Sequence, residues 1–245
     1  MAVHEKGKHI SGMNNKKSSG PDKISNQLLK LASPYIAGSQ TYIFSLCIEQ
    51  NVFPSEFQKA KVFHLAKTRD HKNLNDYRPI SLLSVLSKLL ERYVHKHLVT
   101  YLETRDLFHP LQSGFRRKHS CNTALARLTD SWLSAINRSV LSGGVFLDLK
   151  KAFDRVDQRI FPSKLSVCLN ISNSVPFFLS FFFLFFAYLK NRLQRVFIRG
   201  SYSSEGTVKY GVPHGSVLGP VLFCICINNL LVQTIRFCRM SYARG

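Results

Sequence analysis

The stretch from Val145 to Asp154 constrains what this chain can fold into more than any other part of its sequence. It reads VFLDLKKAFD, so Val145, Leu147 and Leu149 share one face of a strand while Phe146 and Asp148 share the other. We therefore expect a buried strand that carries Asp148 at its end, facing a cleft. Carboxylates bind Mg²⁺ as hard oxygen ligands, and phosphoryl transfer between nucleotides typically uses two such ions. The pattern indicates half of a nucleotidyl-transfer site, whose other acids must lie elsewhere.

A glycine-rich turn is the second landmark. It begins at Gly211 and leads into an apolar stretch that reaches Leu230. Its three glycines allow the backbone to approach a ligand closely. Ser216 is a suitable N-cap for a following helix, and Pro220 is tolerated only near the first turn of that helix.

These two segments and four further motifs resemble, in their order, the reverse transcriptases of non-LTR retrotransposons, the LINE-like group that includes the jockey and CR1 types. The other motifs are SGPDKI over 19–24, DYRPISLL over 76–83, QSGFR over 112–116 and LQRV over 193–196. The resemblance covers nearly the whole chain. It implies an RNA-directed DNA polymerase that uses an RNA template, a DNA primer, deoxynucleoside triphosphates and Mg²⁺.

The spacing of the apolar residues, and the residues that break it between segments, predict an α+β arrangement. Helices are expected over 26–31, 39–49, 81–102 and 122–136, a short strand over 61–65 and a charged loop over 67–76. By resemblance, the fold is that of a right-hand polymerase without its thumb. The expected regions are a basic disordered tail over 1–18, a fingers-like region over 19–140 and an incomplete palm over 141–245.

The resemblance gives roles to residues of the first landmark and of the fingers. Asp148 would be the catalytic acid and a metal ligand, and Leu149 would add its backbone carbonyl to the metal site. Phe153 matches an aromatic that excludes a ribose 2′-hydroxyl by shape, although without the motif it would be taken as a core residue. Arg116 matches a residue that holds the incoming triphosphate, a task suited to its fork of donors.

Nucleotide binding is also expected at His214 and Gly215, where the family usually has glutamine before the glycine. Imidazole is a rigid ring that can become charged near neutral pH, so the change puts nucleotide positioning in doubt. Nucleic-acid contacts are expected from Arg78, Arg117 and Lys118, and the last two could equally be solvated loop residues. Asp154 and Asp157 fall where a helix begins, so capping is favoured over catalysis for them.

The end of the sequence departs from the family pattern. The pattern continues with an aromatic-Ala-Asp-Asp motif, whereas this chain has Tyr242 and Ala243 followed by Arg244 and Gly245. Replacing an attractive unit charge by a repulsive one at ~4 Å changes an interaction of roughly 4 kcal/mol at an effective dielectric of ~20. We therefore expect this chain to be an inactive reverse transcriptase domain. A noncatalytic nucleic-acid-binding remnant and an inert product of a decayed element remain the alternatives.

Composition agrees with a polyanionic partner. Lys plus Arg number 34 against 14 for Asp plus Glu, a formal net charge of +20. A membrane-binding or ribosomal protein could carry the same charge. The six cysteines form no C-x-x-C pair, so we expect reduced thiols, no disulfide partner, and a cytoplasmic or nuclear location.

An uncharged, phenylalanine-rich run occupies residues 175–189. It is shorter than the ~20 apolar residues that a membrane-spanning helix needs. We expect a poorly packed, aggregation-prone core helix here and no membrane partner.

Overall fold

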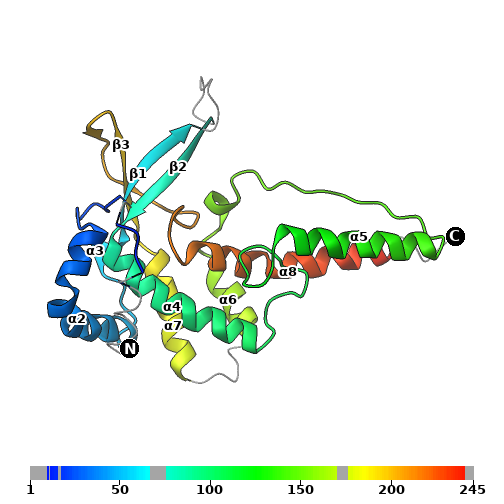
Figure 1. Cartoon of the computed structure of the whole chain (residues 1–245), viewed down its shortest axis with the longest axis horizontal. Helices are drawn as coiled ribbons and strands as arrows, with labels where there is room; N and C mark the ends of the chain where they lie inside the picture. Colours follow the sequence, from blue (N-terminus) through cyan, green and yellow to red (C-terminus); the bar gives the residue numbers. More distant parts are fainter. Residues whose placement is uncertain (1–9, 11, 16–17, 67–75, 170–175, 241–245) are drawn as a thin grey trace.

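The computed structural model describes the chain except for residues 1–9, 11, 16–17, 67–75, 170–175 and 241–245 (Figure 1). The helices are α2 (Asn26–Glu49), α3 (Ser55–Gln58), α4 (Val85–Thr104), α5 (Cys121–Asn137), the 3₁₀ helix η2 (Ala152–Arg155), α6 (Phe161–Leu169), α7 (Pro176–Leu189) and α8 (Gly219–Met240). The strands are β1 (Lys59–Ala66), β2 (Tyr77–Leu83), β3 (Leu193–Ile198), β4 (Ser201–Tyr202) and β5 (Gly206–Thr207). This is the mixed α and β fold that the sequence predicts.

One sheet joins residues that are far apart in the sequence. Its order is β2-β1-β3-β4, with β5 also paired to β3. β1 and β2 form an antiparallel hairpin, whereas β1 and β3 pair in parallel only over 59–62 and 193–196. Beyond that short pairing the two arms of the sheet diverge (Figure 1). The sheet therefore connects the expected fingers-like region with the expected palm region across the boundary at residue 140.

The core lies among α2, α4, α6, α7 and α8. Its most deeply buried side chains include Leu90 and Leu102 of α4, Leu165 of α6, Phe185 of α7 and Leu222 of α8. α5, α8 and the segment that follows α5 extend away from this core to the right of the view (Figure 1). None of the α5 side chains is buried, so α5 contributes little to the core.

Several predicted elements are confirmed with adjusted ends. The strand over 61–65 is part of β1, and the helix over 122–136 is α5, whose Ser120 and Thr123 form a capping box. Two predicted helices are one, because α2 continues through Pro34. Residues 81–83 belong to β2 and not to a helix, because they pair with β1 and α4 begins only after its N-cap Ser84. Most of the charged loop expected over 67–76 lies outside the described residues.

The expected strand around Asp148 does not form. Residues 140–149 have no regular structure, and Val145 and Phe146 are 87% and 81% exposed. A strand is stable only when its backbone groups find partners, and the five described strands pair elsewhere. Alternation of apolar residues predicts an extended segment, but it does not show whether a neighbouring strand is present to pair with that segment.

Two further expectations concern packing. The tail expected over 1–18 is partly packed, because Ile10 and Met13 are buried in the core. The described end of α7 is also well packed, with Leu184, Phe185 and Leu189 buried. Among the described residues, no helix is both long and apolar enough to cross a membrane.

Candidate nucleotide and nucleic-acid site

The glycine turn is docked on η2 by its backbone. Gly211 donates to the Val156 carbonyl at 2.7 Å, and Val212 donates to the Phe153 carbonyl at 2.9 Å. Gly211 has φ +84°, and a Cβ there would lie 2.8 Å from the Phe153 oxygen. Both the positive φ and the close approach require glycine at this position.

The other end of the turn is docked on the edge of β2. The Ser81 N–H donates to the His214 carbonyl at 2.8 Å. Gly215 has φ +96°, and a Cβ there would lie 2.9 Å from the Ser81 oxygen. The turn therefore holds residues from motifs more than a hundred positions apart in fixed register.

A buried carboxylate supports the turn from below. Glu91 of α4 is fully buried, and its Oε2 accepts the N–H groups of Val217 at 2.7 Å and Leu218 at 3.3 Å. The Ser87 hydroxyl donates to its Oε1 at 2.9 Å. Burial raises the pKa of Glu91, while the charge of Arg192 and these hydrogen bonds oppose that rise. Ser216 caps α8 as expected, since its Oγ accepts the Gly219 N–H at 3.0 Å.

Arg192 and Tyr188 complete this buried polar group. Arg192 is 1% exposed, donates from Nη1 to the Tyr188 carbonyl at 3.0 Å, and lies over the Tyr188 ring at 4.8 Å. Burial also raises the pKa of Tyr188. A buried guanidinium needs a nearby negative charge. Glu91 is that acid, because the charge of Arg192 favours its ionised form and so opposes the effect of burial on its pKa.

An open pocket of about 560 Å³, here named the His214 pocket, lies between the turn, η2 and β2. The His214 Nε2 and the Asp154 Oδ1 are 3.0 Å apart at its wall. Nine residues line it: Tyr77, Arg78, Pro79, Ile80, Lys151, Phe153, Asp154, His214 and Gly215. Its volume is within the range typical of small-molecule pockets.

Aromatic packing fixes the ring of Phe153 in this wall. The ring stacks on Phe223 with centroids 4.8 Å apart and meets the edge of Phe115 at 5.8 Å. The His214 ring lies 5.3 Å from it. Because offset-stacked and edge contacts favour particular ring orientations, Phe153 presents a rigid apolar surface to the pocket.

The pocket brings together four of the nine residues for which sequence predicted a site role: Arg78, Phe153, His214 and Gly215. Asp148 and Leu149 are exposed on the irregular segment and do not line the pocket. Arg117 and Lys118 are exposed in the loop before α5.

Arg116 has a different environment from the one expected. It forms a two-point ion pair with Glu103, through Nε at 3.0 Å and Nη2 at 2.6 Å, and Nη1 donates to the carbonyls of His109 and Gln112. This pair lowers the pKa of Glu103. In this structure Arg116 connects the end of α4 to the following loop.

The described residues do not fit a metal site. Within the described ranges, no group of three or more His, Cys, Asp or Glu side chains could hold a metal ion. Asp148, the predicted metal ligand, is an exposed acid on the irregular segment, and Arg244 and Gly245 lie outside the described residues.

Sequence patterns missed several residues that shape this site. Asp154 pairs with His214, whereas the sequence favoured a capping role for it. Lys151 lines the pocket from a left-handed backbone conformation with φ 56°. Glu91 had no motif around it, and only a charged residue at an apolar position of a helix could have indicated it.

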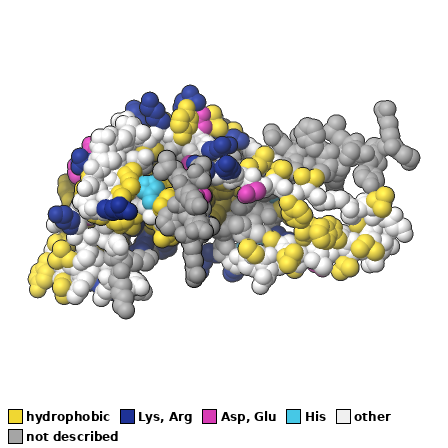
Figure 2. Space-filling view, turned by 90° about the horizontal axis from the view of Figure 1, so that it is seen from above, with side chains coloured by type: hydrophobic (Ala, Val, Ile, Leu, Met, Phe, Trp, Pro, Cys, Tyr) yellow, Lys and Arg dark blue, Asp and Glu magenta, His cyan; other side chains and the backbone are white. Residues whose placement is uncertain are grey.

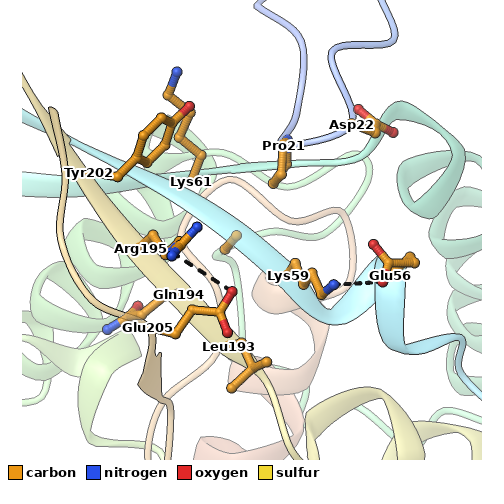
Figure 3. Close-up of a pocket in the computed structure, with 11 residues that line it drawn as sticks. Pro21, Asp22, Glu56, Lys59, Lys61, Leu193, Gln194, Arg195, Tyr202 and Glu205 are labelled. Atoms are coloured by element: carbon orange, nitrogen blue, oxygen red, sulfur yellow. Dashed lines mark hydrogen bonds and ion pairs between the residues drawn. The ribbon is translucent and has the colours of Figure 1, made fainter. Parts of the chain in front are cut away.

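A pocket on the sheet shows a different pattern of charge (Figure 3). This sheet pocket, of about 290 Å³, contains Lys59, Lys61 and Arg195. Lys59 pairs with Glu56 at 2.6 Å, and Arg195 lies 3.8 Å from Glu205. The Lys61 ammonium lies over aromatic rings, with the Phe197 centroid at 3.7 Å. Two of its three cations are therefore already paired with acids.

Comparison with known proteins identifies the family. Residues 67–243 match the model of the family described as reverse transcriptase (RNA-dependent DNA polymerase). The chain belongs to this reverse transcriptase family. It is 32% identical over 216 residues to a probable RNA-directed DNA polymerase from transposon BS of Drosophila melanogaster, covering 88% of this chain and 23% of that protein.

Other relatives place the reverse transcriptase domain among those of non-LTR, LINE-like elements. It is 31% identical over 222 residues to the probable enzyme from transposon X-element, covering 90% of this chain and 24% of that protein. It is 28% identical over 228 residues to the enzyme from mobile element jockey, covering 89% and 23%. Both are from Drosophila melanogaster. The chain spans about a quarter of the length of these relatives.

A solved structure supports the same fold. Apo telomerase from Candida tropicalis, truncated from the C-terminal domain, superposes with a TM-score of 0.50 at 14% identity. The match covers 91% of this chain and 48% of the telomerase chain. At that identity the likeness concerns the fold alone.

Proposed function

We propose that this chain is the part of a retrotransposon reverse transcriptase that binds a deoxynucleoside triphosphate in the His214 pocket, beside an RNA template and a DNA primer. The observation that carries the proposal is the gathering of Arg78, Phe153, His214 and Gly215 from three separate motifs around one pocket. The proposed arrangement keeps a fingers-like region over 19–140 and a palm region over 141–245, in a nuclear or cytoplasmic protein.

Charge and shape in the pocket suit a triphosphate on a deoxyribose. Arg78 and Lys151 supply cations for phosphate oxygens. Gly215 lets the backbone approach the nucleotide. The ring of Phe153 is fixed between Phe223 and Phe115. It therefore excludes a ribose 2′-hydroxyl by shape, because it cannot move aside at low cost.

We further propose that this chain does not polymerise DNA by itself. Arg244 and Gly245 occupy the positions where the family pattern has two acids. Asp148 has no cluster of metal-ligating side chains around it among the described residues. A divalent cation, Mg²⁺ by family expectation, would supply charge neutralisation of the phosphates, and a polymerase site would need carboxylates beyond those described. Noncatalytic nucleic-acid binding is therefore the second candidate function.

The nucleotide-binding proposal is tested by measuring the affinity of the purified chain for dATP and ATP by isothermal titration calorimetry. We expect tighter binding of dATP, and we expect Phe153→Val to bring the two affinities together by opening space beside the sugar. Arg78→Gln should weaken both nucleotides about tenfold, since it removes a charged hydrogen bond. Phe146→Val is the matched control, an exposed phenylalanine outside the pocket. Equal affinities of the wild type for both nucleotides would contradict the proposed gate.

The catalytic proposal is tested by primer extension on an RNA template with Mg²⁺ or Mn²⁺. We expect no template-dependent incorporation. Incorporation that disappears in Asp148→Asn would show that Asp148 acts in a complete site and would overturn this part of the proposal.

A further inference from the structure

A second pocket with nucleotide-binding chemistry shares no residue with the His214 pocket. It has a volume of about 410 Å³ and lies among the end of α7, the segment after β5 and the residues before α6. We name it the Tyr210 pocket. Its lining consists of Gln158, Arg159, Phe186, Leu189, Lys190, Asn191, Thr207, Val208, Lys209 and Tyr210.

Backbone contacts and one side-chain hydrogen bond hold the walls of this pocket in place. Gly211 donates to the Val156 carbonyl at 2.7 Å, and an isolated bridge pairs Asp157 with Tyr210. Gln158 donates from Nε2 to the Gly211 carbonyl at 2.9 Å. These contacts hold the backbone around Tyr210 in place without a ligand. Such preorganisation lowers the entropic cost of binding.

Two aromatic faces and three cations meet here. Tyr210 is 52% exposed and Phe186 is 44% exposed. The Arg159 guanidinium lies 5.7 Å from the Tyr210 centroid, and the Lys190 ammonium lies 5.7 Å from the Phe186 centroid. Lys209 adds the third cation. Such rings stack on nucleobases, and such cations bind phosphate.

The charge of the Tyr210 pocket is not balanced from within. Arg159 pairs with Asp157 at 2.8 Å, whereas Lys190 and Lys209 form no ion pair with a described acid. The sheet pocket of Figure 3 differs, because its lining contains three acids, Asp22, Glu56 and Glu205, beside its three cations, whereas the residues that line the Tyr210 pocket include no acid. Of these two pockets, the Tyr210 pocket is therefore the one that attracts a phosphate.

We propose that the Tyr210 pocket binds one nucleotide unit, with an aromatic base stacked on Tyr210 and its phosphate held by Lys190 and Lys209. The unit is either a free nucleotide or an unpaired residue of a single strand. The volume lies near the lower end of the range for small-ligand pockets, so it admits a single nucleotide and not a duplex.

This inference goes beyond the proposed nucleotide binding at His214 and does not depend on it. The two sites are neighbours, because a smaller pocket of about 220 Å³ contains both Tyr210 and His214 in its lining. Variants must therefore be chosen that alter the Tyr210 pocket alone. Lys190 and Lys209 meet this condition, since neither lines the His214 pocket or the smaller pocket, and Tyr210 lines the smaller pocket but not the His214 pocket.

The test measures the affinity of the full chain for a short single-stranded RNA, by fluorescence anisotropy at several salt concentrations, and for AMP by calorimetry. Tyr210→Leu should lower affinity about tenfold by removing the stacking face, and Tyr210→Phe should keep it. The double variant Lys190→Gln with Lys209→Gln should reduce the slope of log affinity against log salt by about 0.7, because both lysines hold the same phosphate. The control, Lys23→Gln with Arg138→Gln, removes the same charge at two exposed positions outside the pocket.

The outcomes separate the two sources of the nucleotide. Loss of AMP binding in Tyr210→Leu supports a free-nucleotide site, whereas loss of RNA binding alone supports an unpaired residue of a strand. Both readings fail if Tyr210→Leu binds RNA and AMP like the wild type. They also fail if the control double variant changes the salt slope as much as the lysine variant does. A result in which only Phe153 and Arg78 variants lose affinity would keep the proposed function and overturn this inference.

Discussion

The buried carboxylate of Glu91 makes the sharpest prediction about stability. Its Oε2 accepts two N–H groups at the start of α8, from Val217 and Leu218, and its Oε1 accepts the Ser87 hydroxyl. Its negative charge also faces the buried Arg192. Replacing it by alanine leaves these donors in the core without an acceptor, and leaves a guanidinium without a counter-charge.

The size of the loss follows from those partners. Leaving a buried donor unsatisfied costs about 1–3 kcal/mol, and removing one partner of a buried ion pair costs about 3–5 kcal/mol. These terms overlap, so we expect Glu91→Ala to lower the free energy of unfolding by about 4 kcal/mol. Glu91→Gln keeps one oxygen acceptor for the Val217 N–H but loses the second acceptor oxygen, so we expect about 2 kcal/mol.

The assay is urea unfolding followed by circular dichroism, near pH 7, with Glu49→Ala as the control. Glu49 is exposed at the end of α2, so its removal should change the free energy of unfolding by less than about 0.5 kcal/mol. The reasoning is refuted if Glu91→Ala resembles the control, or if the glutamine and alanine variants are equally destabilised.

The dependence of stability on pH gives a second test of the role of Glu91. Burial raises the pKa of Glu91, so the folded state holds its proton more tightly than the unfolded state. Its contribution to stability is then largest below the ordinary glutamate pKa of about 4.3 and decreases as the pH rises through the folded value. The difference between wild type and Glu91→Gln should therefore narrow as the pH rises, and a widening difference would contradict this assignment.

Three further predictions concern other parts of the chain. Glu103→Gln should cost about 1 kcal/mol near neutral pH by breaking the partly buried pair with Arg116, as measured by urea unfolding. Because Arg116 lowers the pKa of Glu103, that cost should vanish as the pH falls below about 4.3 and through the folded value. Gly211→Ala should cost at least about 2 kcal/mol and weaken nucleotide binding, because its Cβ would meet the Phe153 carbonyl at a positive φ. Phe146→Asp should raise the concentration at which light scattering detects aggregates without lowering the free energy of unfolding, because that side chain is exposed.

Each of these has a result that would contradict it. A cost for Glu103→Gln that is the same at low and neutral pH would remove the ion pair as its cause. Full nucleotide affinity in Gly211→Ala would show that the turn does not need its strained conformation. Figure 2 shows hydrophobic side chains on the part of the molecule that extends to the right. Unchanged aggregation in Phe146→Asp would mean that the exposed apolar side chains of residues 140–149 are not the surface that associates.

Local chemistry made many elements predictable. The β1 strand and α5 follow from alternation and helical spacing, and the Ser216 cap follows from a hydroxyl placed before an apolar helix. The glycines at 211 and 215 were expected to allow close approach, and the structure gives them the positive φ values that require glycine. These features depend on residues within one turn or one strand, so a single sequence contains the information.

Elements that depend on distant partners could not be predicted in this way. The alternation around Asp148 indicated a strand, yet no described strand pairs with it and the segment stays irregular. Arg116 was assigned to a nucleotide from its motif, whereas Glu103, thirteen positions earlier, binds it in this structure. Asp154 became part of the pocket only because the glycine turn brings His214 within 3.0 Å of it.

The sequence by itself determined the family, the α and β elements and the residue types at the nucleotide turn, because motifs and local propensity are carried by short stretches of chain. Only the tertiary structure decided which of those residues meet. The pairing of β1 with β3, the docking of the turn on β2 and the placing of Glu91 beneath α8 bring together positions more than a hundred residues apart. Such contacts form because burial and hydrogen bonding in three dimensions favour them. The spacing of residues within one segment does not specify which distant segment it will contact.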